Sequence, residues 1–375
     1  MSSNPILLEN LSLFPATPEQ TLECLKRTAI EWANGFTTED FVRRETILSL
    51  QEHGAEGKLT SWVIAPRANP KTLDFMCSCD TFRRTAVVAR PGADPKAKEI
   101  IAYGIASVFT PPEKRRNGYA RHMMRLLHWV LAPWSTLPPF PKAWGAPPAV
   151  AHGNAQLSIL YSDIGPNFYY TCGPDGNGTP GWVECESVET SLVLSSERMR
   201  ENVSAPHKSS HSWMWLGEDD MKYVWEQDVE WMKADLAASA SSTSRLQVAF
   251  LTDKGVGASQ GATLHDVLEN IGSGRPTFAT WSLDTLASSR TLILTRLRAT
   301  RVTFPALVER LIEFARRCDV VKIEIWGMNT ELQEVAGGLG WETTRRASHL
   351  ASMKWYGKEV SDEIDWAFNE RFCWV

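Results

Sequence analysis

The sequence has 375 residues, which is long for one average domain and suits two domains that each bury a core. Its 43% of hydrophobic and 22% of charged residues are typical of a globular protein, and it contains no block of like charges. A net charge of -5 at pH 7 argues against nucleic acid as the main partner, because nucleic-acid binders usually present a basic face. We therefore expect a small-molecule partner.

The seven cysteines are an odd number at irregular spacing, so they do not describe a disulfide framework. No pair has the spacing of zinc ligands, and we predict a reducing, cytoplasmic setting and no bound metal. The N-terminus lacks a basic region followed by an apolar run, and no apolar stretch of 18 residues occurs later. Neither secretion nor a membrane partner is expected.

The N-terminal part of the chain predicts a strand, two helices and a strand meander. A short strand is expected around 11–14, and the helix that follows opens at Thr17, which can form a capping box with Gln20. A second helix is expected over 37–50. Three apolar runs have the length and composition of strands, and they cover 59–66, 82–90 and 100–110.

The stretch "FTPPEKRRNGYARHMMRLLHWVL", residues 109–131, settles into a helical pattern only after Gly118. Its apolar residues fall on one helix face, and Pro133 ends the helix. These residues are Met123, Met124, Leu126, Leu127, Val130 and Leu131. A proline-rich loop then leads to an apolar run over 155–165 and a strand-like run over 182–194.

The second half of the chain begins with a polar stretch after residue 195 and a helix over 218–244 that runs into a Ser/Ala linker. The later segments are predicted as strands over 246–253, 277–283 and 291–300, a helix over 305–318, a strand over 320–327, a helix over 330–340 and a strand over 349–357. This order repeats that of the first half. We therefore predict two copies of one α/β architecture.

The loop before the helix at Gly118 has the chemistry of an anion site. A helix N-terminus presents unpaired backbone N–H groups and the positive end of the helix dipole. Arg115, Arg116 and Arg121 add positive charge without any Asp or Glu among them, which is the reverse of what helix capping favours. A phosphate-bearing ligand explains this pattern, and a solvated basic loop is the alternative. The pattern fits neither a Walker loop nor a dinucleotide fingerprint.

Residues 115–120, Arg-Arg-Asn-Gly-Tyr-Ala, resemble the R/Q-x-x-G-x-G/A pyrophosphate loop of the GNAT acetyltransferases. The resemblance implies acetyl-CoA as co-substrate, with its pyrophosphate held by backbone N–H groups of Arg115, Arg116, Asn117, Gly118, Tyr119, Ala120 and Arg121. It also implies that Val108, Phe109 and Thr110 pair with the pantetheine. The runs "IASVFTPPEKRRNGYARHMM" and "LYSDIGPNFY" are similar to fungal lysine N-acetyltransferases, which acetylate free lysine.

A second GNAT element is the pattern F-Y-x-x-x-G, which residues 168–173 match. It implies that Tyr169 protonates the coenzyme thiolate as it leaves, a role that a phenol can fill. Pro166 shortens the preceding helix and leaves the register open, so Tyr170 is an alternative. The alternative is that Tyr169 is a buried tyrosine with a structural role.

The reaction also needs a base, because the side-chain amine of lysine is mostly protonated at neutral pH. Many GNAT enzymes place a Glu on the fourth strand, but the run over 100–110 contains no carboxylate. Asp80 and Asp163 are side-chain candidates, and each also fits a structural role. The third candidate is the carboxylate of Val375, which burial of Phe372 and Trp374 would hold in place. Simple hydrophobic docking of this tail is the alternative.

The second copy contains no glycine between Arg296 and Phe314, where a pyrophosphate loop would lie, so we predict that it binds no coenzyme. The predicted fold class is α/β (α+β), with a GNAT-type mixed sheet flanked by helices and followed by a second, degenerate GNAT-like domain. The predicted boundaries are 1–195 for the acetyl-CoA-binding domain, 196–245 for a linker and helix, 246–357 for the degenerate domain and 358–375 for a C-terminal tail.

The predicted function is direct acetyl transfer from acetyl-CoA to a small amine, with the side-chain amine of free lysine as first choice. Arg83 and Arg84 are candidates for binding the carboxylate of such an amino acid. The alternatives are another amine and a coenzyme-A-binding module without turnover. A remote alternative is a serine hydrolase that uses Ser259 of a G-x-S-x-G match, with Asp284 and His349. The oligomeric state stays open.

Overall fold

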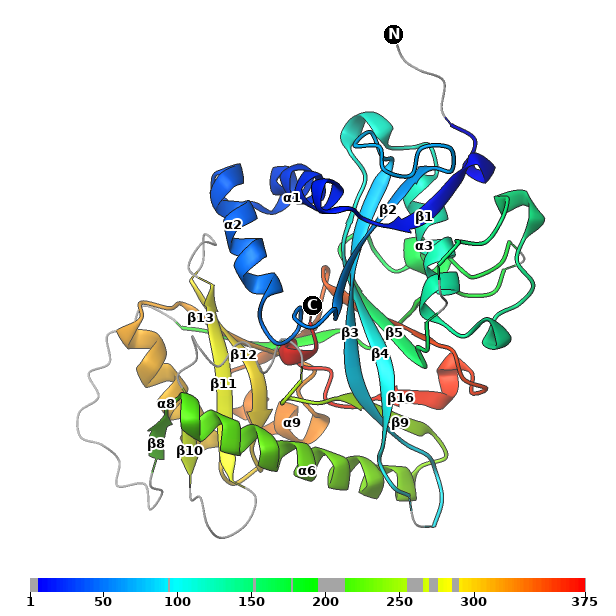
Figure 1. The fold of residues 1–375 in the computed structure, drawn as a ribbon. Coiled ribbons are helices and arrows are strands. Elements are labelled where there is room, and N and C mark those ends of the chain that lie inside the picture. The colour runs from blue at the N-terminus through cyan, green and yellow to red at the C-terminus, as the bar shows by residue number, and fades with distance from the viewer. Residues whose placement is uncertain are drawn as a thin grey trace.

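The computed structural model describes residues 6–93, 95–150, 153–176, 178–194, 213–254, 266–269, 276–284 and 290–374. Within these residues the chain forms two mixed β-sheets, one of nine strands and one of seven, with helices packed against both. Figure 1 shows the first sheet on the right, the second at the lower left and the C-terminal segment near the centre. The mixed α/β fold that the sequence predicts is confirmed.

The first sheet has the strand order β1-β2-β3-β4-β5-β15-β6, with β9 and β16 attached at the far end of β3. Its strands are β1 (Leu11–Pro15), β2 (Leu59–Pro66), β3 (Cys77–Ala89), β4 (Lys98–Phe109), β5 (Leu157–Ser162), β6 (Val183–Glu184), β9 (Leu246–Phe250), β15 (Leu350–Trp355) and β16 (Ile364–Trp366). Neighbours among β1 to β4 are antiparallel, whereas β4 and β5 are parallel. β3 begins at Cys77 and not at residue 82 as predicted, because residues 77–82 pair with β2.

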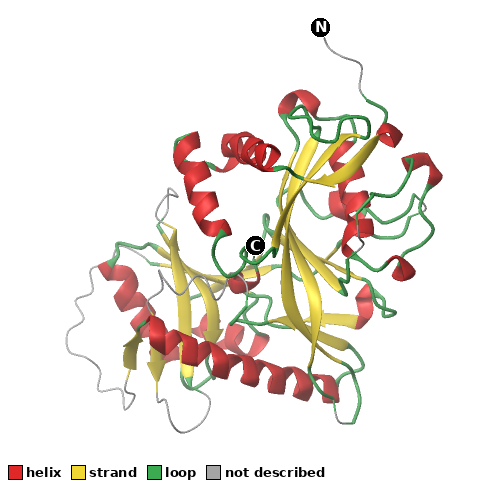
Figure 2. Cartoon of the chain, viewed as in Figure 1, coloured by secondary structure: helices red, strands yellow, loops and turns green. Residues whose placement is uncertain are grey.

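Helices α1 (Pro18–Trp32) and α2 (Thr38–Ser49) pack beside β1 and β2. The predicted capping box opens α1: Thr17 Oγ1 accepts from the N–H of Gln20 at 3.2 Å, and Gln20 Oε1 accepts from the N–H of Thr17 at 3.0 Å. Cys24 of α1 joins a buried cluster with Val63, Ala65 and Phe75. Figure 2 shows these two helices and the long helix after Gly118 on opposite sides of the first sheet.

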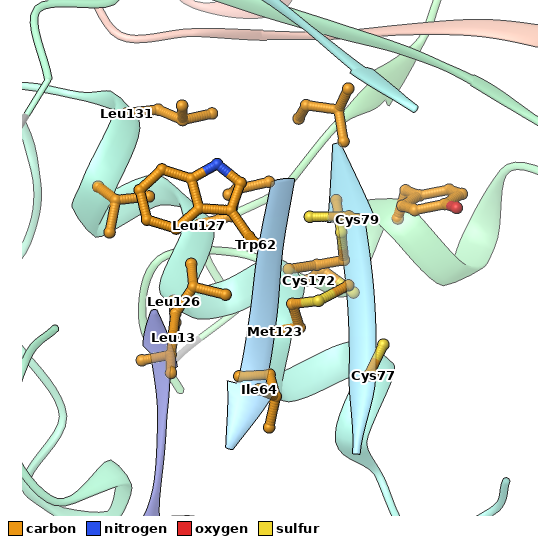
Figure 3. Close-up of a cluster of buried hydrophobic side chains, with 14 of the residues drawn as sticks. Leu13, Trp62, Ile64, Cys77, Cys79, Met123, Leu126, Leu127, Leu131 and Cys172 are labelled. Atoms are coloured by element: carbon orange, nitrogen blue, oxygen red, sulfur yellow. The ribbon is translucent and has the colours of Figure 1, made fainter. Parts of the chain in front are cut away.

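The other face of the first sheet is covered by α3 (Tyr119–Leu131) and the single turn α4 (Asn167–Tyr170). All six predicted core residues of α3 are buried, because the apolar positions recur on one side of the helix. Figure 3 shows Met123, Leu126, Leu127 and Leu131 packed against Trp62 and Ile64 of β2 and against Cys77 and Cys79 of β3. This core fixes the start of α3 relative to the end of β4.

The second sheet has the strand order β14-β7-β13-β12-β11-β10-β8. Its strands are β7 (Val188–Val193), β8 (Trp213–Leu216), β10 (Asp266–Glu269), β11 (Thr277–Asp284), β12 (Thr291–Arg298), β13 (Lys322–Trp326) and β14 (Glu342–Arg345). Helices α8 (Phe304–Arg317) and α9 (Thr330–Gly338) pack on it around Trp281, Leu311 and Trp341.

The order β12-α8-β13-α9 in the second sheet repeats the order β4-α3-β5-α4 in the first. In each copy the two strands are parallel, and the strand before them pairs antiparallel with the first of the two, which carries a β-bulge. The second copy that the sequence predicts is therefore present in the structure.

Strands cross between the two halves of the chain. The predicted single strand over 182–194 is wrong: it is two strands, of which β6 pairs in the first sheet and β7 in the second. In return, β9, β15 and β16 from the second half complete the first sheet. The predicted domain boundaries stay predictions, but each sheet depends on strands from both sides of residue 195. The two halves are thereby tied together by backbone hydrogen bonds.

The long helix α6 (Glu218–Ser242) packs against both sheets. Its first half contributes Met221, Val224 and Trp225 to a cluster with Phe278 of β11, and its second half packs Met232, Leu236 and Ala240 against the first sheet. Figure 1 shows α6 crossing the lower edge of the molecule. No described helix is long and apolar enough to span a bilayer.

His128 of α3 is buried and neutral, with Nδ1 at 2.8 Å from Tyr356 Oη and Nε2 at 2.8 Å from the carbonyl oxygen of Cys172. Its ring stacks on Trp182 with centroids 4.3 Å apart. Burial lowers the pKa of His128 to about 3. The unfolded chain takes up this proton near pH 6.5 and the folded chain only near pH 3, so stability is lost as the pH falls.

We predict that lowering the pH from 7 to 5 removes about 2 kcal/mol of the free energy of unfolding through His128 alone. Urea unfolding at both pH values measures this loss. The variant His128→Gln lowers stability at pH 7 but has a shallower pH dependence than the wild type. An unchanged pH slope in the variant would show that His128 is not the titrating group.

Candidate active site

The candidate site begins where β4 and β5 diverge. Their parallel pairing covers residues 102–105 of β4 and 157–160 of β5, although β4 continues to Phe109 and β5 to Ser162. The register between β3 and β4 shifts at the same level, and Ser107 has a φ of 54°. Because of this bulge, the edge of β4 from residue 106 onward has no partner strand on the β5 side. An extended ligand with amide groups can pair with this edge.

The loop after β4 leaves a row of unpaired backbone N–H groups. None of the N–H groups of residues 116–121 donates to an acceptor among the described residues, and the first helical bond of α3 runs from His122 N–H to the Gly118 carbonyl at 2.9 Å. The N–H of Arg115 is used by the carbonyl of Pro112 at 3.2 Å, so the predicted donor row begins one residue later than expected. Six donors at one helix N-terminus form a site for a diphosphate.

Left-handed backbone at Arg116 (φ 65°) and at Gly118 (φ 79°) gives the loop its shape. Gly118 is the N-cap of α3, and a side chain there would meet only Leu8 Cδ1, at 3.7 Å. The glycine is therefore needed for its backbone conformation and for an open approach to the donors, and not for space within the protein.

The three arginines of the loop are exposed, which suits contact with a charged ligand. Arg115 donates to the carbonyl of Thr110 at 2.9 Å and pairs with Glu31 of α1 at 2.7 Å, which fixes the loop to β4. The side chain of Tyr119 is buried, and its hydroxyl accepts from the N–H of Ile6 at 3.3 Å. Tyr119 can thus contribute only its N–H to a ligand, and the coenzyme contacts of residues 108–110 and 115–121 remain predictions.

Tyr169 lies in α4, buried against the core around α3, whereas Tyr170 is 46% exposed. No described residue hydrogen-bonds the Tyr169 hydroxyl. Burial raises the pKa of the Tyr169 phenol above its ordinary value, so the phenol stays protonated at neutral pH. Cys172, Cys77 and Cys79 lie near enough to Tyr169 to add to this rise where they ionise, which places Tyr169 close to β3.

Asp80 lies on β3, directly opposite Ala106 at the β4 bulge. Its Oδ1 accepts from Ser61 Oγ at 2.6 Å, and Ser107 of the bulge also hydrogen-bonds to it. Burial raises the pKa of the Asp80 carboxyl above its ordinary value. A carboxylate with a raised pKa is a better base than an exposed one, and Asp80 lies opposite the bulge of β4, across β4 from its open edge.

Asp163 follows β5, and its carboxylate is held by His349. Asp163 Oδ1 accepts from the N–H of His349 at 2.9 Å and lies 2.9 Å from His349 Nδ1. The hydrogen bond from His349 lowers the pKa of Asp163. Asp163 is therefore a weaker base than Asp80, and its two bonds connect the end of β5 to the segment that leads into β15.

The C-terminal tail runs into the centre of the molecule, and Figure 1 shows its red segment near the first sheet. Phe372 and Cys373 are fully buried, and Arg84 of β3 donates to the carbonyl oxygens of both residues. Arg84 was a candidate for binding a substrate carboxylate, but its guanidinium holds the tail instead, and Arg83 is exposed. Val375, the third candidate base, lies outside the described residues.

In the second copy, β12 corresponds to β4, and the C-terminal tail packs on the edge of β12 that corresponds to the open edge of β4. β12 and β13 pair only over 291–294 and 322–325. Beyond this pairing, the N–H of Leu297 donates to Glu370 Oε2 at 2.7 Å. Glu370 also pairs with Arg296, which binds Asp228 of α6 at 2.8 Å. A cavity of about 410 Å³ remains beside Phe368 and Asn329. The chain thus fills this edge with its own carboxylate.

Ser259 of the hydrolase alternative also lies outside the described residues. His349 pairs with Asp163, as described above, and Asp284 ends β11. All seven cysteines are free, and no described group of three His, Cys, Asp or Glu side chains is arranged to hold a metal ion.

Several solved structures have a similar fold. A conserved protein of unknown function from Enterococcus faecalis, described as a probable N-acyltransferase, has a TM-score of 0.54 and 13% identity, covering 92% of this chain and 72% of that one. A GCN5-related N-acetyltransferase from Kribbella flavida has a TM-score of 0.52 and 13% identity, covering 92% and 71%. Another from Anabaena variabilis has a TM-score of 0.51 and 12% identity, covering 92% and 73%. The likeness to these proteins shows that the chain has the fold of GCN5-related N-acetyltransferases.

Two sequence comparisons each match part of the chain. Residues 199–375 match the family model of the LYC1 GNAT-like C-terminal domain. A lysine acetyltransferase from Yarrowia lipolytica is 28% identical over 109 residues, which are 29% of this chain and 26% of that relative. The chain therefore aligns with about a quarter of the curated relative's length.

We predict that Gly118→Glu weakens acetyl-CoA binding on the order of 100-fold, because it places a negative charge and a side chain at the donor row. Isothermal titration calorimetry measures the affinity. Gly57→Glu is the matched control, since Gly57 also has left-handed backbone (φ 72°) and open space around it but lies outside the loop. Equal affinities of the two variants would contradict the assignment of the loop.

Proposed function

We propose that this protein is an N-acetyltransferase that moves an acetyl group from acetyl-CoA directly to a primary amine of a small molecule, and that the acceptor is the side-chain amine of free lysine. The observation that carries this proposal is the row of unpaired N–H groups at residues 116–121 beside the open edge of β4. Acetyl-CoA has both a diphosphate for the first feature and amide groups for the second, joined in one molecule.

In this proposal the backbone donors of residues 116–121 bind the pyrophosphate, and the arginines of the loop balance its charge. The pantetheine extends along β4 toward the bulge at Ser107, where the chain can orient the thioester carbonyl. The amine nitrogen then attacks the carbonyl carbon and forms the N–C bond, and the C–S bond breaks as the intermediate collapses.

Direct transfer is supported by the state of the cysteines near this edge. Cys77 and Cys79 are fully buried, and burial raises the pKa of Cys77 to about 12. A buried thiol with a raised pKa is a poor nucleophile, because the thiolate is the reactive form. An acyl-enzyme on these residues is therefore disfavoured.

The reaction needs two proton transfers, one from the attacking amine and one to the departing sulfur, and the proposal assigns a residue to each. The attacking amine loses a proton to a base, for which Asp80 beside the β4 bulge and the carboxylate of Val375 are the two candidates. The departing sulfur takes a proton from the Tyr169 hydroxyl, which is then replaced from solvent. The support for Tyr169 is its protonated phenol without a hydrogen-bond partner among the described residues.

The choice of lysine is supported by the similarity of the chain to a lysine acetyltransferase from Yarrowia lipolytica. The matching C-terminal family model supports the same branch. Cytoplasmic location remains a prediction from the sequence.

Release of free thiol from acetyl-CoA in the presence of lysine, ornithine, polyamines and lysine-containing peptides tests the function. We expect turnover with free lysine at a kcat/KM above that of the other amines, with the product acetylated at the side chain as read by mass spectrometry. Coenzyme binding without thiol release from any amine would instead identify a binding module.

Two variants separate the candidate bases. If Asp80 is the base, Asp80→Asn lowers kcat on the order of 100-fold or more and leaves acetyl-CoA affinity unchanged. If the carboxylate of Val375 is the base, two glycines added after Val375 have this effect and Asp80→Asn does not. The same two glycines added at the N-terminus are the control for the extension. Full kcat in both variants would exclude both candidates.

A further inference from the structure

A cluster of aromatic and basic side chains lies where the tail meets the end of β5. We call Tyr161, Trp326, Arg346, Arg371 and Trp374 the arginine cluster. The Arg346 guanidinium lies 3.9 Å from the ring centroid of Trp326, and that of Arg371 lies 4.2 Å from Trp326 and 3.7 Å from Trp374. Tyr161 interacts with both arginines. Of these residues the sequence pointed only to Trp374.

Arg346 is the unusual member of the cluster. It is only 8% exposed, and its Nε and Nη1 are buried without a hydrogen-bond partner among the described residues. Burial lowers the pKa of Arg346, but a guanidinium remains charged in proteins. A buried charge without an ion pair is strongly destabilising, so its presence calls for an anion from outside the described chain.

The nearby carboxylates do not fill this role, because each has another partner. Glu189 and Glu324 both bind Lys322, and Glu184 binds Arg345 at 2.7 Å. Asp163 is held by His349, as described above. Arg371 adds a second positive charge, which Glu324 and Asp284 attract. Nε and Nη1 of Arg346 thus remain without a carboxylate partner among the described residues.

The cluster lies at the mouth of the gap between β4 and β5. Tyr161 is the first residue of β5 beyond the pairing with β4, which ends at Leu160. Its hydroxyl donates to Asn369 Oδ1 of the tail at 3.2 Å. Ile159, two residues earlier, packs in the same cluster as Phe372, so Tyr161 faces the tail side of the sheet, away from α3. The cluster thus lies on the tail side of the first sheet, at the end of β5 that diverges from β4.

We propose that Arg346, assisted by Arg371, binds the carboxylate of the acceptor, so that the acceptor is an amino acid and not a diamine or polyamine. This inference rests on the proposed acetyl transfer to an amine. A carboxylate fits the fork of a guanidinium, and it neutralises the charge that the described chain leaves unpaired. The amine at the other end of the acceptor then points toward the thioester.

The test compares L-lysine with 1,5-diaminopentane, which is lysine without its carboxylate. We expect the wild-type protein to prefer lysine on the order of 100-fold in kcat/KM, because a buried charged pair contributes this much to recognition. Arg346→Gln raises KM for lysine and removes the preference, while kcat/KM for 1,5-diaminopentane stays the same. Arg346→Lys restores part of the preference. The matched control is Arg345→Gln, since Arg345 is the exposed neighbour in sequence.

Two results overturn the inference. One is a wild-type protein that acetylates lysine and 1,5-diaminopentane equally well, which can be observed even if the Arg346 variants do not fold. The other is a variant in which both acceptors are lost in parallel, as they would be if Arg346 held the tail or the carboxylate of Val375. Absence of thiol release with any amine is a different outcome, because it shows that the proposed transferase function itself fails.

Discussion

The divergence of β4 from β5 is the constraint on which the rest of this structure depends. Parallel pairing ends at Ile105 and Leu160, and the bulge at Ser107 turns the remaining edge of β4 away from any partner strand. Unpaired backbone groups need hydrogen-bond partners, so a ligand with amide groups stabilises this arrangement. The same divergence directs the chain into the loop before α3, where six N–H groups form the proposed anion site. One backbone feature thus creates both halves of the proposed coenzyme site.

In the second copy of the fold, the chain itself supplies a partner for the corresponding strand edge. There the tail supplies Glu370 to the N–H of Leu297, and the buried ion pairs of Arg296 with Glu370 and Asp228 connect the tail to β12 and α6. Breaking such a buried network by removing one partner is strongly destabilising. The degenerate copy therefore acts as an anchor that brings residues 371–374 to the first sheet, where Arg84 binds the tail carbonyls.

The arginines at the two ends of the proposed site differ in their exposure to solvent. Around α3 the arginines are exposed and flank a loop that a sequence pattern can describe. In the arginine cluster, Arg346 and Arg371 come from segments 25 residues apart and meet on Trp326, which belongs to a third segment. The first arrangement suits a large, partly solvated diphosphate, whereas the second suits one small anion that is fully enclosed.

The sequence alone determined what depends on local chemistry: the capping box of α1, the apolar face of α3, the loop at Gly118 and the repeat of strand, helix, strand and helix. These depend on residues within a few turns of one another, so spacing and composition report them. It did not determine that the run over 182–194 divides between two sheets, that Arg84 holds the tail, or that Arg346 lies buried beside Arg371. Only the tertiary structure decided these features, because strand pairing and buried charge depend on partners that are far apart in the chain.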